Sequence, residues 1–181
     1  MPMEIHASSV VRHSRDRVFR AYRDELPRIA AYMPNVKSVE TVRREDLPGR
    51  CQLHNVWTGK GESPKVAQHL VRPEILLWDD YATWHDEGTW CEWRIGLRVF
   101  ADKFQCSGTN HITDEGPYAR VTLRGELRVD LTDIPGVPRL FARPLKPQIE
   151  AFIVKLIRPN LEDTNVALGK YLDANPGMVP G

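Results

Sequence analysis

The amino-acid sequence predicts an α+β protein in which a curved antiparallel sheet of about seven strands packs against one long C-terminal helix. Apolar residues recur at steps of three and four from Lys146 to Leu172, which is typical of an amphipathic helix with one buried face. Upstream, several segments alternate between polar and apolar residues and are separated by turn sequences. This second pattern is typical of antiparallel strands that have one face in the core and one in water.

The C-terminal helix needs a broad apolar surface, because a helix of about 40 Å is not stable alone in water. Its predicted buried face consists of Ile149, Phe152, Ile153, Leu156, Ile157, Leu161, Leu168, Tyr171 and Leu172. Pro159 removes one backbone hydrogen bond, and we expect it to kink the helix near Lys155. The strands upstream supply the surface against which this helix packs.

Two short helices follow the first strand, Met3–Val11, because Pro27 interrupts the helical pattern that begins after the predicted N-cap Ser14. The second short helix is expected at 28–32. The remaining strands are expected at 36–42, 50–58, 75–85, 89–99, 103–113 and 118–131. Residues 64–71 fit either a helical turn or a loop insertion.

A chain of 181 residues has room for one domain with a substantial core. We expect a single domain over residues 1–175 and a flexible tail rich in proline and glycine over residues 176–181. A formal net charge of +1 gives no overall attraction to nucleic acid. No run of about 20 apolar residues is present, so we expect no transmembrane segment.

The cysteines, Cys51, Cys91 and Cys106, are odd in number and form no CxxC pair. This usage favours reduced thiols in a cytoplasmic protein, and the first residues lack the apolar core of a secretory signal. The histidines show no ligand spacing, and no phosphate-binding or dinucleotide motif is present. We therefore expect neither a metal site nor a cofactor.

Three polar residues fall on strand faces that are otherwise apolar. Alternation places Asn55 on the inner face of its strand, Asp80 on the next, and Asn110 on a later one. Polar groups of this kind orient ligands in pockets. The alternative is that each is satisfied by backbone groups or water. A register error of one residue would move all of them to the opposite face.

The tryptophans gather between Trp57 and Trp93, with Trp78 between them, and Trp90 is a candidate for the outer face. Their large apolar surfaces and N–H groups suit the wall of a binding cavity, although plain core packing explains them equally. With Phe152 and Leu156 of the C-terminal helix, they are the predicted apolar contacts of a ligand. Asn55, Asp80 and Asn110 are the predicted polar contacts.

Basic residues flank the start and the middle of the C-terminal helix: Arg139, Arg143, Lys146, Lys155 and Arg158. Such a set could make transient contact with an anionic membrane. Acidic residues are interspersed among them, which favours an ordinary solvated helix face. The oligomeric state is left open.

The segment IHASSVVRHSRDRVFRAYRD, the following YMPNVKSVE and the long C-terminal helix resemble the START-like or Bet v 1-like superfamily, particularly its polyketide cyclase and lipid transport branch. Val18–Phe19 and Pro34 stand where such families carry a V-F or V-W pair and a proline. The resemblance implies a helix-grip fold with a cavity between sheet and helix. Members bind lipids, sterols or polyketides there, and some catalyse cyclisation or dehydration, without a shared catalytic motif.

The leading hypothesis is that the protein binds a small hydrophobic molecule in an internal cavity. The alternative is a polyketide aromatase/cyclase or dehydratase, for which Asp80 is the candidate acid or base. A second alternative is an accessory protein that binds no ligand. Whether the protein is an enzyme is left open by the sequence.

Overall fold

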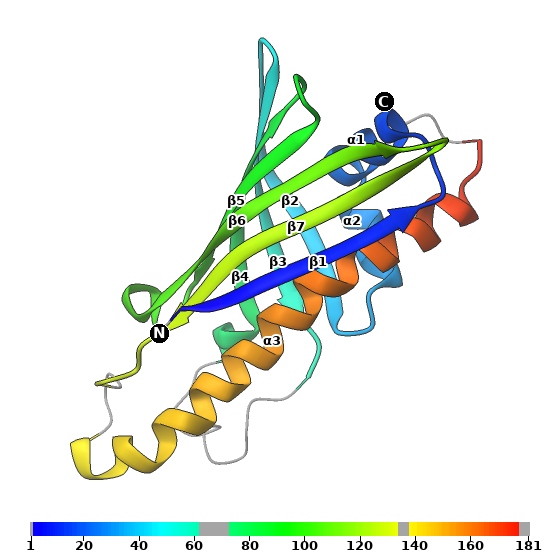
Figure 1. Ribbon diagram of the computed structural model, residues 1–181. Coiled ribbons are helices and arrows are strands. Elements are labelled where there is room, and N and C mark those ends of the chain that lie inside the picture. Colours follow the sequence, from blue (N-terminus) through cyan, green and yellow to red (C-terminus); the bar gives the residue numbers. More distant parts are fainter. Residues whose placement is uncertain (1, 62–72, 134–137, 178–181) are drawn as a thin grey trace.

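A computed structural model describes residues 2–61, 73–133 and 138–177 of the protein, and it confirms the predicted fold class (Figure 1). One antiparallel sheet of seven strands curves around the long helix α3, Arg139–Ala174. The strands are β1 (Met3–Val11), β2 (Val36–Leu47), β3 (Arg50–Gly59), β4 (Leu77–His85), β5 (Trp90–Leu97), β6 (Phe104–Glu115) and β7 (Tyr118–Val129). Their spatial order is β1-β7-β6-β5-β4-β3-β2, so the first strand pairs with the last.

The short helices α1 (Arg15–Asp24) and α2 (Leu26–Ile29), with the 3₁₀ turn η1 (Ala30–Tyr32), connect β1 to β2. Ser14 is the N-cap residue of α1, although its hydroxyl makes no capping hydrogen bond. Helix α2 begins two residues earlier than expected, because Pro27 is accommodated in its first turn, where the missing N–H costs nothing. Figure 1 shows these helices beside the C-terminal end of α3.

Helix α3 begins at Arg139, seven residues before the expected start at Lys146. Pro144 and Pro147 lie inside this added segment of the helix, where buried Ala142 and Leu145 hold it against the rest of the molecule. The helical conformation also continues through Pro159. The kink expected near Lys155 stays a prediction.

The C-terminal end of α3 is tied to α1 and to the residues just before it by two side chains. The guanidinium of Arg17 on α1 donates to the carbonyl oxygen of Asn175 at 2.6 Å and to that of Leu172 at 3.5 Å. The ring of His13, just before α1, lies 2.8 Å from a carboxylate oxygen of Asp173. The hydrogen bonds from Arg17 satisfy carbonyl groups at the end of the helix, and both side chains hold this end of α3 in place.

Two sequence-based expectations fall wholly or partly outside the described residues. The helical turn or loop at 64–71 lies there. So does the end of the predicted tail, from residue 178 onward. Within the described part of the chain, no helix is long and apolar enough to cross a membrane.

A pair of glycines makes room for one indole on the inner face of the sheet, the face toward α3. Gly108 on β6 lies directly opposite Gly125 on β7. A Cβ atom at Gly108 would come within 2.5 Å of the ring of Trp93, and one at Gly125 within 2.7 Å. The ring of Trp93 therefore lies across backbone that carries no side chains.

We predict that Gly108→Ala destabilises the protein by about 1–3 kcal/mol, the usual cost of overpacking a core, because the new methyl group would also meet the carbonyl oxygen of Arg124 at 2.2 Å. The matched control is Gly96→Ala on β5, where a Cβ atom would meet nothing within 4 Å. Urea unfolding of both variants measures the difference. Equal stability of the two variants would contradict the packing described for Trp93.

Candidate functional site

Four neighbouring strands bring the predicted polar residues together on the inner face. Asn55 on β3 is paired with Asp80 on β4, and Asn110 on β6 is paired with Cys91 on β5. Asn55, Asp80 and Asn110 are 1%, 9% and 4% exposed, so the strand faces inferred from alternation are confirmed at these positions. Trp90, by contrast, stacks between His85 and His111 at 4.1 and 5.7 Å between ring centroids. These three residues alternate with the buried ones along their strands and lie on the outer face.

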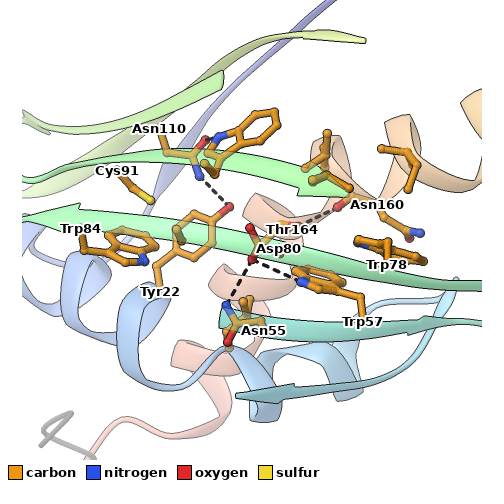
Figure 2. A pocket seen from close by; sticks show the side chains of 16 residues that line it. Tyr22, Asn55, Trp57, Trp78, Asp80, Trp84, Cys91, Asn110, Asn160 and Thr164 are labelled. Carbon is orange, nitrogen blue, oxygen red and sulfur yellow. Dashed lines mark hydrogen bonds between the residues drawn. The ribbon is translucent and has the colours of Figure 1, made fainter. Parts of the chain in front are cut away.

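A cavity lies where this part of the sheet meets α3 (Figure 2). Six of the predicted ligand contacts line it: Asn55, Trp57, Trp78, Asp80, Trp93 and Asn110. It offers about 40 Å³ to the centres of water-sized molecules. At about 10–15 Å³ for each water, this is room for only about three or four waters in the conformation described.

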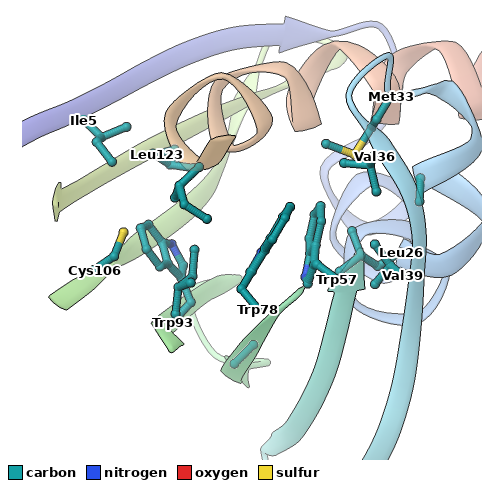
Figure 3. Close-up of a cluster of buried hydrophobic side chains, with 14 of the residues drawn as sticks. Ile5, Leu26, Met33, Val36, Val39, Trp57, Trp78, Trp93, Cys106 and Leu123 are labelled. Atoms are coloured by element: carbon teal, nitrogen blue, oxygen red, sulfur yellow. The ribbon is translucent and has the colours of Figure 1, made fainter. Parts of the chain in front are cut away.

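The indoles of Trp57, Trp78 and Trp93 point from the strands toward α3 and form the apolar wall of the cavity (Figure 3). Trp57 and Trp78 are stacked, with ring centroids 5.7 Å apart and planes inclined by 20°. Two further predicted contacts, Phe152 and Leu156, are not among the lining residues. Leu156 instead packs over Gly59, where a Cβ atom would lie 2.8 Å from it, and the ligand-binding role of both stays a prediction.

Asp80 is held by two donors from β3. Its Oδ2 accepts hydrogen bonds from Asn55 Nδ2 at 3.1 Å and from Trp57 Nε1 at 3.3 Å. Asn55 is itself positioned from β2, since its Oδ1 accepts from the Thr41 hydroxyl at 2.8 Å. No hydrogen bond from the described residues reaches Asp80 Oδ1. One oxygen of the carboxyl group is thus fixed by the sheet, and the other is left for the cavity.

Burial raises the pKa of Asp80 above its ordinary value, and the hydrogen bonds from Asn55 and Trp57 only partly oppose the rise. His54 is the one basic group that acts on this carboxyl within the described part of the chain. The imidazole of His54 is engaged elsewhere, 2.7 Å from Asp79. Asp80 is therefore a buried acid that forms no ion pair with any described residue.

A second hydrogen-bonded chain crosses the cavity from the sheet to α1. Trp93 Nε1 donates to Asn110 Oδ1 at 3.2 Å, and Asn110 Nδ2 donates to the hydroxyl of Tyr22 at 3.1 Å. Burial raises the pKa of Tyr22, so its hydroxyl stays protonated and neutral. Sequence reasoning missed Tyr22 as a site residue, because only the fold brings α1 to this face.

Helix α3 contributes a polar segment to the cavity wall. The Thr164 hydroxyl donates to the carbonyl oxygen of Asn160 at 2.6 Å, and Asn160 Nδ2 donates to that of Leu156 at 2.6 Å. Asn160 Oδ1 is buried and has no partner among the described residues. Asn160 and Thr164 were also missed. The available signal was their position, at steps of three and four, on the apolar stripe of the helix.

Among the described residues, the cavity lining contains no activated thiol and no cluster of metal ligands. Cys91 lines it, but burial raises the pKa of its thiol well above the ordinary value and keeps the sulfur protonated. Across residues 2–61, 73–133 and 138–177, no three side chains of His, Cys, Asp or Glu converge in a way that could hold a metal ion. The chemistry of the site therefore rests on Asp80, Tyr22 and the amides.

The basic residues of α3 are largely balanced by acidic neighbours. Lys146 lies 3.8 Å from Glu150, and Arg158 lies 2.8 Å from Glu162. Arg143 and Lys155 are exposed, and the side chain of Arg139 is outside the described part. This arrangement favours a solvated helix face over a membrane-binding one.

No protein-family model and no curated protein matches this sequence. Solved structures do match along nearly the whole chain. A protein from Thermus thermophilus is 22% identical, with a TM-score of 0.65 over 95% of this chain and 98% of the other. The Zhui aromatase/cyclase from a Streptomyces species is 17% identical, with a TM-score of 0.62 over 99% and 100%.

Norcoclaurine synthase from Thalictrum flavum, in complex with dopamine and hydroxybenzaldehyde, is 14% identical, with a TM-score of 0.57 over 97% of this chain and 88% of the other. At these identities the likeness concerns the fold and does not extend to activity. The agreement covers the sheet, the short helices after β1 and the long terminal helix. This chain therefore has the helix-grip fold.

Proposed function

We propose that this protein binds a small, mostly apolar molecule in the cavity between the inner face of the sheet and α3. The observation that carries the proposal is the combination of three indole walls with a buried carboxyl group, one oxygen of which accepts no hydrogen bond from the described residues. Apolar walls with a few convergent polar groups are typical of small-molecule sites. The walls supply affinity, at roughly 25 cal/mol per Å² of apolar area removed from water, and the carboxyl group orients the guest.

Similarity in fold supports this proposal at a coarse level. The structural neighbours include an aromatase/cyclase and a synthase whose structure holds dopamine and hydroxybenzaldehyde, which are small aromatic molecules. The helix-grip fold of this chain also places its cavity between sheet and helix, where members of the superfamily hold their ligands. Neither neighbour identifies the guest of this protein.

The size of the cavity sets a condition on the proposal. About 40 Å³ accommodates water or a very small guest, so a larger one requires the lining side chains or α3 to move. We infer that the structure described is a closed state. If the cavity never opens, the protein binds no ligand and fits the alternative of an accessory protein. The tests below separate a ligand-binding protein from such an accessory protein.

An enzymatic role is the second candidate, and one observation favours it. Burial raises the pKa of Asp80, which moves this carboxyl group toward the range in which a side chain gives up and takes back a proton near neutral pH. A cyclisation or dehydration needs such proton transfers on a positioned substrate. If Asp80 performs them, Asp80→Asn abolishes turnover of the true substrate without abolishing its binding.

The direct test is native mass spectrometry of gently purified protein, followed by solvent extraction of whatever is bound. We expect a small organic molecule that leaves on extraction. We also expect the purified, emptied protein to bind N-phenyl-1-naphthylamine, a neutral apolar dye whose fluorescence rises in apolar surroundings. A protein that is consistently empty and does not take up the dye would overturn the proposal.

We predict that Ala82→Leu weakens binding of this dye at least tenfold, because Ala82 lines the cavity from β4 and a larger side chain there fills it. A stability loss of about 1–3 kcal/mol is the expected accompanying cost. The control is Thr83→Leu, which places the same side chain on the outer face of the same strand and should leave dye binding unchanged. Similar affinities for the two variants would place the dye outside the cavity.

We predict that the stability of Asp80→Asn relative to the wild type increases as pH rises from about 4 toward 7. The raised pKa means that the folded state holds the Asp80 proton more tightly than the unfolded state does. The wild type therefore loses stability as pH rises through the unfolded value, about 3.9, up to the folded one. The amide side chain of the Asp80→Asn variant does not titrate, so the variant does not lose this stability. Urea unfolding at several pH values measures the difference.

The control for this series is the adjacent carboxyl group, Asp79. Burial alone would raise its pKa, but hydrogen bonds from Arg98 and His54 outweigh burial and lower it. Asp79→Asn should therefore show the opposite trend and lose stability relative to the wild type as pH rises. If both variants follow the same trend, the environment assigned to Asp80 is wrong.

A further inference from the structure

The cavity wall holds two oxygens to which no described residue donates a hydrogen bond. One is Asp80 Oδ1 on the sheet, because both hydrogen bonds to this carboxyl group go to Oδ2. The other is Asn160 Oδ1 on α3, which is buried. Asn160 is only 2% exposed, so bulk water does not satisfy its oxygen. The indole N–H groups of Trp57 and Trp93 already have protein acceptors. A guest that carries hydrogen-bond donors would satisfy both oxygens.

The charge of the site is also incomplete. Asp80 accepts hydrogen bonds from Asn55 and Trp57, and the rest of the cavity wall near it is mostly apolar. Within the described part of the chain, no lysine or arginine acts on this carboxyl group. An ionised carboxylate in such surroundings is costly unless a cation accompanies it. His54 does not fill this role, because its ring contacts Asp79 and stacks on Tyr81 at 4.4 Å. A cationic guest would complete the pair.

The walls suit a cation that carries an apolar group. The rings of Trp57 and Trp78 are stacked, and the ring of Trp84 packs on that of Tyr22 with centroids 5.1 Å apart. The Asp80 carboxyl group thus shares the cavity with several aromatic rings. Indole rings attract cations through their faces and also cover aliphatic or aromatic groups well. One end of the guest can thus be charged while the remainder is apolar.

From these observations we propose that the guest carries a primary ammonium group, which donates to Asp80 Oδ1 and Asn160 Oδ1 while its apolar part lies against the tryptophans. This inference rests on the proposed function, since it assigns the ligand class of the same cavity. An ammonium has three donors in a compact head, which suits two oxygens on facing elements and a third acceptor such as the Thr164 hydroxyl. A quaternary ammonium has no donor, and the five donors of a guanidinium exceed the free acceptors here.

The test compares pairs of probes that differ only in the donor group, on the full chain. Methylammonium and methanol fit the cavity as it is, while benzylammonium, benzyl alcohol and toluene require it to open. Binding is followed by calorimetry for the larger probes and by the NMR signal of the Trp57 indole N–H for the small pair. We expect each ammonium to bind at least tenfold more tightly than its alcohol at pH 7.

Two variants and a control locate the effect. Asp80→Asn should remove the advantage of the ammonium and leave the affinity for toluene within threefold. Asn160→Leu should reduce that advantage without removing it. Asp79→Asn removes a carboxyl group of the same strand that is ion-paired on the outer face, and it should keep the full advantage.

The outcomes separate this inference from the function on which it rests. If toluene and benzyl alcohol bind but the ammonium has no advantage, or if Asp79→Asn removes it as fully as Asp80→Asn, the inference is overturned while ligand binding stands. If none of the probes, the dye included, binds to the wild type, both are overturned. An advantage that disappears only in Asp80→Asn supports both.

Discussion

The contact between α3 and the concave face of the sheet is the constraint on which the rest of the structure depends. Helix α3 runs along that face, which α1 also contacts, and its buried stripe extends from Ala142 to Leu172. The stripe is interrupted by buried polar residues only at Asn160, Thr164 and Asn165, within the part of α3 that is described. Apolar contacts on both sides hold the helix in place, which permits a polar wall between them where the cavity lies.

That polar wall has a cost in stability. Asn160 keeps a buried oxygen without a partner among the described residues, which costs about 1–3 kcal/mol, and burial of the Asp80 carboxyl group adds a desolvation cost. Against a typical net stability of about 5–15 kcal/mol, this is a large fraction. A leucine at either position would fill similar space without the cost. A guest that donates to both oxygens would recover part of it, so the same atoms that weaken the empty fold define what it can bind.

The sequence predicted the elements and strand faces well, because both depend on local periodicity. Alternation along β3, β4 and β6 was enough to place Asn55, Asp80 and Asn110 inside. Strand alternation could not identify Tyr22 as a site residue, because this residue lies on α1 and reaches the cavity only where α1 folds back onto the sheet. The start of α3 was misplaced by seven residues, because the apolar pattern was followed only from Lys146 onward, whereas buried Ala142 and Leu145 extend the packed face of the helix further back. Cavity volume was beyond prediction, since it depends on how side chains from separate strands fit together.

The small volume of the cavity bears on how a guest would be admitted. Moving α3 would break the contacts of Arg17 and His13 with its C-terminal end. Displacing Trp57 or Trp93 would break a hydrogen bond to Asp80 or Asn110. The indole N–H of Trp78 makes no hydrogen bond with the described residues, and its ring is held by stacking on Trp57 and by packing beside Gly59. Counted in hydrogen bonds, the displacement of Trp78 is the least costly way to enlarge the cavity, and it leaves the polar groups that would receive the guest in place.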